Sequence, residues 1–295
     1  MDRAHYPSPE FPRHLQTLYA RFPFERSLAD DPISAVRPLV QDRPSGEIAG
    51  IYAATLAIGN TAAIRGAIGR LADASHGDMR GFVIERSPLE RQAALQGFRH
   101  RWIRGDQMAY LGTRLAKLYE QYDSLEEPFL EGMAEGGFAL GLDRLARSLR
   151  GDEGSARDRA PPGYRALFPS PIDRPRSPCK RMTLYVRWMV RTAYPDLGLW
   201  PHVPTGELRI PLDQHVFWIA YHLGLTRRKT RSWATVEEVT ERLRRIDPID
   251  PVKYDFVLCH TGISGDCPKH RDLSVCSPCV VRPDCLMWRG RSVAA

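Results

Sequence analysis

The sequence of 295 residues contains no apolar run that approaches the roughly 20 residues needed for a membrane-spanning helix. Its beginning, MDRAHYPSPEFPRHLQ, lacks the apolar core of an export signal. Segments with the alternating pattern of β-strands are scarce as well. These absences predict an all-α protein of the cytosol, close to the nucleoid in a bacterium, with no membrane partner.

Cysteine is scarce too, but its placement is informative. The chain has six cysteines, and four of them form the spacing C-x8-C-x2-C-x5-C near its end: Cys267, Cys276, Cys279 and Cys285. Four thiolates so close in sequence can surround one metal centre, either zinc or an iron–sulfur cluster. Two disulfides are the alternative, but they require an oxidising compartment. We therefore predict a metal-binding loop over residues 266–287, and we expect Cys179 and Cys259 to be ordinary buried thiols.

Lysine is rare, with 5 residues against 37 arginines, and the net charge is +7. Between Lys180 and Ala295 there are 18 Lys or Arg and 12 Asp or Glu, so an excess of 18 − 12 = +6 lies in this part of the chain. A basic region beside a metal site is typical of nucleic-acid binding. The arginine bias alone has a second explanation in the base composition of the genome.

Apolar residues recur at three- and four-residue steps along most of the chain, which is the pattern of amphipathic helices. Thr235 with Glu238 predicts a capping box, and Asp250 before Pro251 predicts an N-cap with proline at the first helical position. Gly151–Pro178 holds six prolines and is predicted to be an exposed connection. Helices are expected within 13–21, 47–71, 106–119, 183–190 and 214–225.

Asp213 stands out among the acidic residues because Pro211 precedes it and a helical pattern follows it. This arrangement predicts that Asp213 lies at a helix N-terminus, where free amides and the helix dipole favour a carboxylate. A simple helix cap would explain the aspartate without any function.

Several longer segments resemble one known superfamily. IPLDQHVFWIAYHLGL, which contains Asp213, resembles a segment of the helix-hairpin-helix–Gly/Pro/Asp (HhH-GPD) DNA glycosylases. CSPCVVRPDC resembles the end of the [4Fe–4S] loop in their endonuclease III branch, and FVLCHTGISGDC resembles the helix that delivers the first ligand. AATLAIGNTAAI and GFRHRWIRGDQMAYLGTRLAKL are similar to earlier helices of the superfamily. The resemblance covers about residues 47–287, and it is closest to an uncharacterised bacterial family within the superfamily.

This resemblance implies an all-α, two-lobed fold with the active site between the lobes. A helical barrel lobe with a degenerate hairpin would span 46–200. Residues 1–45 and 201–295 would form the second lobe, with the catalytic aspartate and the iron–sulfur loop. The implied protein is a monomer that binds double-stranded DNA, flips out a damaged or modified base and cleaves its N-glycosidic bond.

The resemblance also implies roles for single residues. Asp213 matches the essential aspartate, and Lys180 matches the lysine that forms a Schiff base in bifunctional members. That amine attacks only when unprotonated, which desolvation or a neighbouring cation such as Arg181 favours. Asn60 matches the residue that lines the base pocket or fills the gap in the duplex. A [4Fe–4S] cluster is expected on the four cysteines, with zinc as the alternative. Further DNA or substrate contacts are expected from Arg181, Arg187, His215, Arg227, Lys229, Lys269 and Arg271, whereas core packing is expected for Trp188, Trp200 and Trp218.

The chain departs from the superfamily in three places. The first two cysteine ligands are eight residues apart instead of six, and RPRSPCK contains none of the glycines usual before the lysine. Lys180 and Asp213 are 33 residues apart, and the additional residues 192–209 are predicted to form a loop at the pocket or groove. Two other functions stay open: a non-catalytic iron–sulfur protein that binds DNA or RNA, and a zinc-stapled scaffold for protein assembly.

Overall fold

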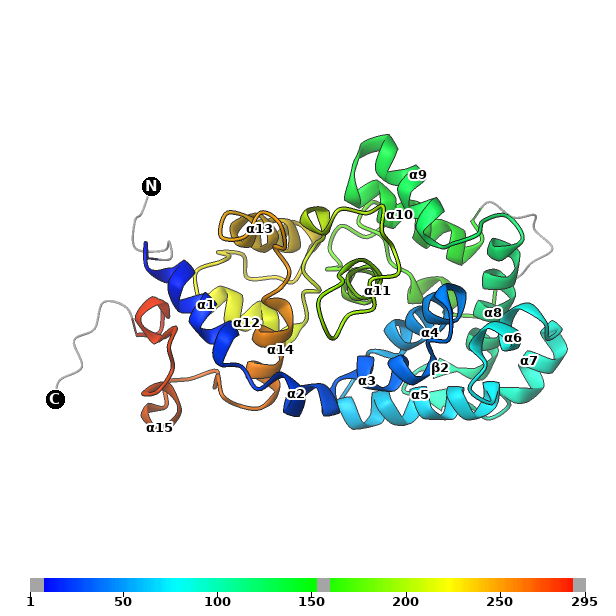
Figure 1. Ribbon diagram of the computed structural model, residues 1–295, viewed down its shortest axis with the longest axis horizontal. Helices are drawn as coiled ribbons and strands as arrows, with labels where there is room; N and C mark the ends of the chain where they lie inside the picture. Colours follow the sequence, from blue (N-terminus) through cyan, green and yellow to red (C-terminus); the bar gives the residue numbers. More distant parts are fainter. Residues whose placement is uncertain (1–7, 153–159, 289–295) are drawn as a thin grey trace.

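The computed structural model describes residues 8–152 and 160–288, and helices dominate this part of the chain. The predicted all-α class is confirmed, since the strands described, β1 (Arg99–His100) and β2 (Ile103–Arg104), form one short antiparallel hairpin. None of the described helices is long and apolar enough to cross a membrane. Figure 1 shows an elongated molecule with helices gathered toward its two ends and α11 (Lys180–Val190) between them.

The larger group of helices surrounds one buried helix, α4. Its N-terminus is fixed by a capping box between Asp42 and Ser45, and almost every residue after Ser45 is buried. Gly50 permits a close approach to α11, because a Cβ there would lie 2.6 Å from Met189 Cε. The helices of this group are α4 (Arg43–Leu56), α5 (Thr61–Ser75), α6 (Met79–Ile84), α7 (Pro88–Ala94), α8 (Gly105–Tyr119), α9 (Glu126–Gly136) and α10 (Phe138–Arg150).

The helix predicted over 47–71 is interrupted. α4 ends at Leu56, Gly59 adopts a φ of +110°, and α5 begins at Thr61 with Asn60 as its N-cap. Glycine tolerates this left-handed conformation and asparagine is a preferred N-cap, so two adjacent residues end one helix and start the next. The apolar period continues across the break, which is why the sequence pattern alone predicts a single helix.

The second group contains α1 (Phe11–Arg21), which confirms the helix predicted within 13–21, and four helices from the end of the chain. Asp284 accepts a hydrogen bond from the Ser8 amide (3.3 Å) and pairs with His14 Nδ1 (2.6 Å). The amide of Leu286 donates to the carbonyl of His222 (2.7 Å). These contacts hold the cysteine-containing segment against α1 and α12. The four helices are α12 (Gln214–His222), α13 (Trp233–Arg244), α14 (Asp255–Ile263) and α15 (Leu273–Cys276).

Two short helices that the sequence did not predict connect the groups along the lower edge of Figure 1, α2 (Phe24–Asp30) and α3 (Pro32–Val36). α3 packs against α4 and α5, although the sequence division placed residues 1–45 in the other lobe. The N-terminal segment thus contacts both groups and brings Asp31, the N-cap of α3, to the boundary between them.

Both predicted caps near the end of the chain are wrong. α13 begins at Trp233 with Ser232 as N-cap, and Glu238 accepts a hydrogen bond from Thr226 Oγ1 (2.8 Å) instead of returning to Thr235. α14 begins only at Asp255, after the turns of residues 251–254. Asp250 is drawn away from capping because its carboxylate pairs with Arg191 (2.8 Å). In both cases the side chain that was predicted to cap a helix bonds to a residue outside that helix.

A helix-hairpin-helix motif would place an α-helix shortly before α11. Residues 160–179, the described part of this segment, contain no α-helix. They contain the 3-10 turn η3 (Tyr164–Leu167) and further turns, and residues 153–159 of the predicted connection lie outside the described residues. Cys179, directly before the helix, has a φ of +50°. This left-handed position is one that glycine occupies most easily, and a buried cysteine occupies it here.

Candidate functional site

A cleft of about 690 Å³ lies between the two groups of helices. Most of its walls come from five places in the chain: the start of α3, the turn between α4 and α5, α11 with the residues before it, the start of α12, and α14. Asp213, Lys180 and Asn60 all line it. Three residues that the sequence singled out separately therefore meet in one cavity.

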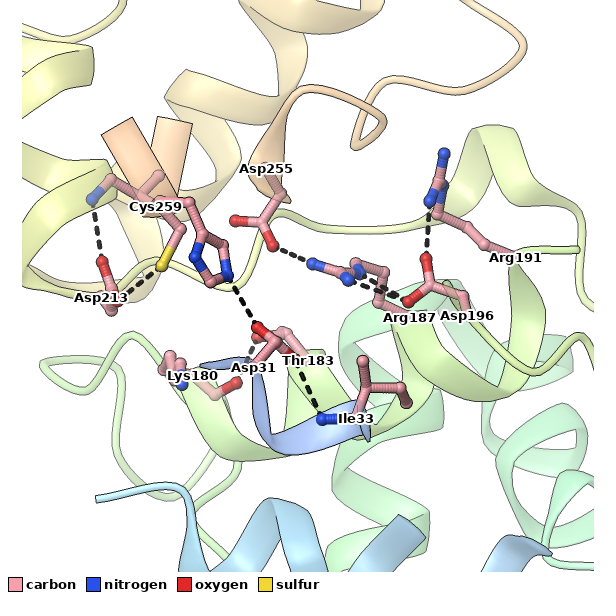
Figure 2. A network of polar contacts seen from close by, with 12 residues as sticks. Asp31, Ile33, Lys180, Thr183, Arg187, Arg191, Asp196, Asp213, Asp255 and Cys259 are labelled. Carbon is pink, nitrogen blue, oxygen red and sulfur yellow. Dashed lines mark hydrogen bonds and ion pairs between the residues drawn. The ribbon is translucent and has the colours of Figure 1, made fainter. Parts of the chain in front are cut away.

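Asp213 is the N-cap of α12, and its two carboxylate oxygens have different partners. Oδ1 accepts a hydrogen bond from the Val216 amide (2.8 Å), and Oδ2 accepts one from the Cys259 thiol (3.3 Å). Figure 2 shows this pair of contacts at the left of the network. Because both oxygens act as acceptors, the environment suits an ionised carboxylate. Asp213 thus caps α12, as the alternative without a function predicts, and it also lines the cleft.

Cys259 was expected to be an ordinary buried thiol, but it contacts the central aspartate. Burial raises the pKa of Cys259 well above its usual range, and the neighbouring Asp213 and Asp255 raise it further. The thiol therefore stays protonated at neutral pH and serves as a hydrogen-bond donor rather than a nucleophile.

Lys180 is the first residue of α11 and is half-buried at the cleft wall. The next residue, Arg181, also lines the cleft, but its guanidinium donates to the main-chain carbonyls of Thr55 (3.2 Å) and Ala166 (3.1 Å). Burial lowers the pKa of Arg181 to about 10. Arg181 thereby ties the start of α11 to α4 and η3, and this holds the main chain at Lys180 in place.

Asn60 is exposed at the cleft, and its side-chain oxygen caps α5 by accepting from the Ala63 amide (2.8 Å). The helix predicted over 47–71 would have placed Asn60 in its interior, whereas Asn60 begins a new helix. Arg101, at the tip of the β1–β2 hairpin, approaches the same turn, because a Cβ on Gly59 would lie 3.0 Å from Arg101 Nη1. The hairpin thus borders the cleft beside Asn60.

Trp102 on this hairpin was missed by the sequence analysis. It is 43% exposed, and the Arg181 guanidinium lies 5.8 Å from its ring centroid. Core packing is confirmed for Trp188 and Trp200, each 1% exposed, but is wrong for Trp218, which is 37% exposed and stacks on His222. The sequence gives no clear signal for this difference, because Trp102 and the buried Trp188 both directly follow an arginine.

An ion-pair chain of five buried or half-buried side chains extends away from the cleft wall, and Figure 2 labels all of them except Asp250. Asp255 pairs with Arg187 Nη1, and Asp196 accepts from Arg187 Nη2 (2.8 Å) and Nε (3.2 Å). Asp196 also accepts from Arg191 (2.6 Å), which binds Asp250 through Nε and Nη2. Hereafter the ion-pair chain means these residues, in the order Asp255, Arg187, Asp196, Arg191 and Asp250.

The ion-pair chain corrects one prediction. Arg187 was expected to contact DNA, but it is 3% exposed and its guanidinium is engaged by two aspartates. Burial alone would lower the pKa of Arg187, yet Asp196 and Asp255 outweigh this effect and raise it. Arg187 lies in the cleft wall, where its guanidinium holds Asp196 and Asp255 in place.

A second pair connects α3 to α14. His260 Nε2 lies 2.9 Å from Asp31 Oδ2, and both residues line the cleft. Burial would raise the pKa of Asp31, but the hydrogen bond and charge of His260 and the amide of Ile33 lower it. The N-terminal segment therefore contributes an acidic side chain to the cleft wall, and no sequence motif predicted this.

The inserted residues 192–209 do not form the predicted pocket loop, because none of them lines the cleft. Trp200 is buried and donates from Nε1 to Glu47 Oε1 (2.7 Å), while Asp196 belongs to the ion-pair chain. The insertion packs on the other side of α11 and stabilises the larger group of helices.

The basic residues expected to contact DNA divide into two sets. His215 is half-buried in the cleft. It packs closely against Gly262 of α14, because a Cβ on Gly262 would lie 2.7 Å from the Cβ of His215. Arg231, which the sequence analysis did not select, also lines the cleft and is exposed. The others are exposed outside it: Arg227, Lys229, Lys269 and Arg271.

The four cysteines near the end of the chain line one separate cavity beside α12 and α14: Cys267, Cys276, Cys279 and Cys285. Burial raises the pKa of Cys267 to about 12, and the three other thiols add to this effect. Within residues 8–152 and 160–288, no three His, Cys, Asp or Glu side chains are arranged to hold one metal ion.

The donor set nevertheless fits a larger sulfur-ligated group, since thiolates are the ligands of iron–sulfur clusters. Two buried nitrogens in the same cavity wall, His222 Nε2 and Trp288 Nε1, have no hydrogen-bond partner among the described residues. Such groups are able to donate to the sulfurs of a cluster.

Comparison with known proteins gives one match. A family model described as "Protein of unknown function (DUF2400)" matches residues 31–264. No curated protein and no solved structure matches the chain. The matched range contains every residue of the cleft and ends just before the first of the four clustered cysteines.

Proposed function

The chain belongs to the DUF2400 family, and we propose that it is a DNA N-glycosylase acting on double-stranded DNA as a monomer. In this proposal the cleft receives a nucleotide flipped out of the duplex, and its N-glycosidic bond is hydrolysed there. Flipping costs a few kcal/mol, less for a damaged or poorly paired base, and this difference contributes to selectivity.

The observation that carries the proposal is the meeting of Asp213 and Lys180 in one cleft. They are 33 residues apart, on the first turns of two different helices, and the inserted segment between them folds away from the cavity. The cleft volume of about 690 Å³ lies within the roughly 300–1,000 Å³ typical of ligand sites, so an entire modified base fits.

Asp213 has the environment that this reaction requires. Positive charge develops on the sugar as the base departs, and a carboxylate nearby stabilises that state and accepts a proton from the attacking water. The Val216 amide and the Cys259 thiol hold Asp213 in one orientation, so little reorganisation is needed during the reaction. Exposed Arg227, Lys229, Lys269 and Arg271 supply positive charge for the phosphate backbone.

Lys180 would attack the sugar in a bifunctional reaction and form a Schiff base. We expect borohydride to trap a covalent complex of the protein with DNA, and we expect Lys180→Ala to lose this complex. Lys117→Ala, a control that removes a lysine of α8 outside the cleft and outside the predicted DNA contacts, should retain it. Denaturing electrophoresis measures both. Trapping that survives Lys180→Ala would remove Lys180 from this role.

The four cysteines would hold a [4Fe–4S] cluster that stabilises the end of the chain. Iron analysis and visible absorbance of anaerobically purified protein should show about four irons per chain. Cys279→Ala should lose most of the iron and the absorbance, whereas Cys179→Ala, which removes a buried thiol outside the cavity, should keep both. Stoichiometric zinc in the purified protein would contradict the iron–sulfur assignment.

Base release tests the proposed function directly. Duplexes that carry a panel of damaged and bulky modified bases are incubated with the protein, and mass spectrometry identifies any free base. Release of one base names the substrate, and the size of the cleft leads us to include bulky, virus-type modifications. Tight binding without release from any duplex would instead support a non-catalytic DNA- or RNA-binding protein.

A further inference from the structure

Asp255 is a further acidic residue in the cleft, besides Asp213 and Asp31, and the sequence analysis did not select it. It is the first residue of α14, is 3% exposed and lines the same cavity as Asp213 and Lys180. Cys259 follows four residues later, so the two side chains lie on one face of α14, with Cβ atoms about 5–6 Å apart. Cys259 also contacts Asp213, so its thiol links the face of α14 that bears Asp255 to the Asp213 carboxylate.

One oxygen of Asp255 is unused. Its Oδ2 pairs with Arg187, but its Oδ1 is buried and has no hydrogen-bond partner among the described residues. In Figure 2 this oxygen points to the side on which Cys259 and Asp213 lie. A buried polar atom without a partner is costly, so this oxygen gains if it carries a proton or acquires a partner when a ligand enters the cleft.

The ion-pair chain leaves Asp255 short of positive charge. It contains three carboxyl groups and two guanidiniums, and Asp196 holds three of the hydrogen bonds that the arginines donate. Asp250 at the far end binds Arg191 through two nitrogens and is partly exposed to water. Asp255, at the cleft end, is fully buried and has one contact with the shared Arg187. Among the three carboxyl groups of the ion-pair chain, a proton is therefore most stable on Asp255.

The charges around Asp255 agree with this placement. Burial raises the pKa of Asp255 to about 6, and the Asp213 carboxylate adds to the effect, while Arg187 and Lys180 oppose it. The other groups close by are the Cys259 thiol, which stays neutral, and Asp31 with its partner His260. DNA in the cleft would exclude water and add phosphate charge, and both effects favour the protonated form further.

We propose that Asp255 is the general acid of the reaction and gives the proton on its Oδ1 to the departing base. This inference rests on the glycosylase function proposed above. The bond between the sugar C1′ and the base nitrogen breaks, and its electron pair goes to the base, which takes the proton of Asp255. Water then bonds to C1′ and loses a proton to Asp213. Asp213 releases this proton to solvent, and Asp255 regains one from solvent.

Two carboxyl groups with different surroundings in one site are the arrangement that acid–base cleavage of a glycosidic bond needs. Both oxygens of Asp213 accept hydrogen bonds, whereas Asp255 has an oxygen left on which to carry a proton.

The test compares single-turnover base release by the wild-type protein, Asp255→Asn and the control Asp250→Asn between pH 5 and 9. The substrate is the duplex whose base the release panel identifies. The wild-type rate should fall on the alkaline side as Asp255 loses its proton. Asp255→Asn retains a side chain that can bond Arg187 but cannot donate a proton to the base. It should be slower by about 10²–10⁴-fold at low pH and should lack the alkaline decline.

Asp250→Asn removes a carboxylate from the other end of the ion-pair chain and should keep the alkaline decline. A substrate analogue whose base is a better leaving group depends less on protonation of the departing nitrogen. With this analogue the difference in release rate between wild type and Asp255→Asn should be smaller. A purely structural role for Asp255 would slow both substrates equally and leave the shape of the pH profile unchanged, which would overturn the inference.

A second measurement does not depend on base release. The folded-state pKa of about 6 lies above the value of 3.8 for an unperturbed aspartate, so the protonated group favours folding at low pH. This stabilisation is lost as the pH rises through about 6. The melting temperature of wild type relative to Asp255→Asn should therefore decline from pH 4 to pH 7, and a constant difference would show that Asp255 holds no proton.

The outcomes separate the two proposals. No base release from any duplex would reject the glycosylase function and the general-acid role with it. Release by wild type, combined with an unchanged rate and pH profile in Asp255→Asn, would reject the role of Asp255 alone.

Discussion

Asp213→Asn is expected to abolish base release while the protein stays folded. In the proposed reaction the carboxylate stabilises the sugar cation and accepts a proton from water, and an amide would do neither. We expect the single-turnover rate to fall by about 10³-fold, which is of the order seen when an enzyme loses one preorganised electrostatic group. The measurement is mass spectrometry of the free base from the duplex that the wild-type protein cleaves.

The same position offers its own structural control, because Asp213 also caps α12. An asparagine oxygen can accept the Val216 amide as the aspartate does, so Asp213→Asn should melt near the wild-type temperature. Asp213→Ala loses the cap as well and should be less stable by about 1 kcal/mol. If Asp213→Asn still releases base at the wild-type rate, Asp213 is a helix cap and nothing more.

Arg187→Met is expected to destabilise the folded protein strongly. The variant retains much of the aliphatic volume but leaves Asp196 and Asp255 buried without their shared guanidinium. Breaking a buried ion pair by removing one partner typically costs about 3–5 kcal/mol, because the remaining charge stays out of water. Urea denaturation followed by circular dichroism gives the change in the free energy of unfolding.

Arg245→Met is the matched control. Arg245 lies at the end of α13, its side chain is 68% exposed, and it faces Glu241 at 3.5 Å. Exposed pairs of this kind contribute little, so this variant should stay within about 0.5 kcal/mol of wild type. Equal losses for the two arginine variants would mean that the ion-pair chain does not stabilise the fold.

Arg187 also shows why the predicted DNA contacts could not all be assigned from charge alone. Arg187 was expected from the sequence to contact DNA, as one of several basic residues in the second half of the chain. A sequence records the charge of a side chain but not the direction in which it points. Only the fold shows that two aspartates, 9 and 68 residues away along the chain, enclose this guanidinium.

The sequence by itself determined the features that depend on neighbours within a few residues. Apolar residues at helical spacing predicted an all-α chain and most of its longer helices, because one apolar face per helix suffices to drive burial. Pro211 before Asp213 predicted a helix N-terminus there, and the structure confirms Asp213 as the N-cap. The close spacing of four cysteines predicted that they would meet, and they line one cavity.

The tertiary structure decided what depends on contacts between distant residues. Asp31 meets His260 across 229 residues, Cys259 meets Asp213 across 46, and Asp255 meets Arg187 across 68. No local pattern encodes such pairs, since each side chain fits its own helix equally well without its partner. The environment of a carboxyl group in the cleft arises from these contacts. The sequence could therefore identify Asp213 from its helix cap, while the buried position and unused oxygen of Asp255 emerge only when α11, α12 and α14 pack together.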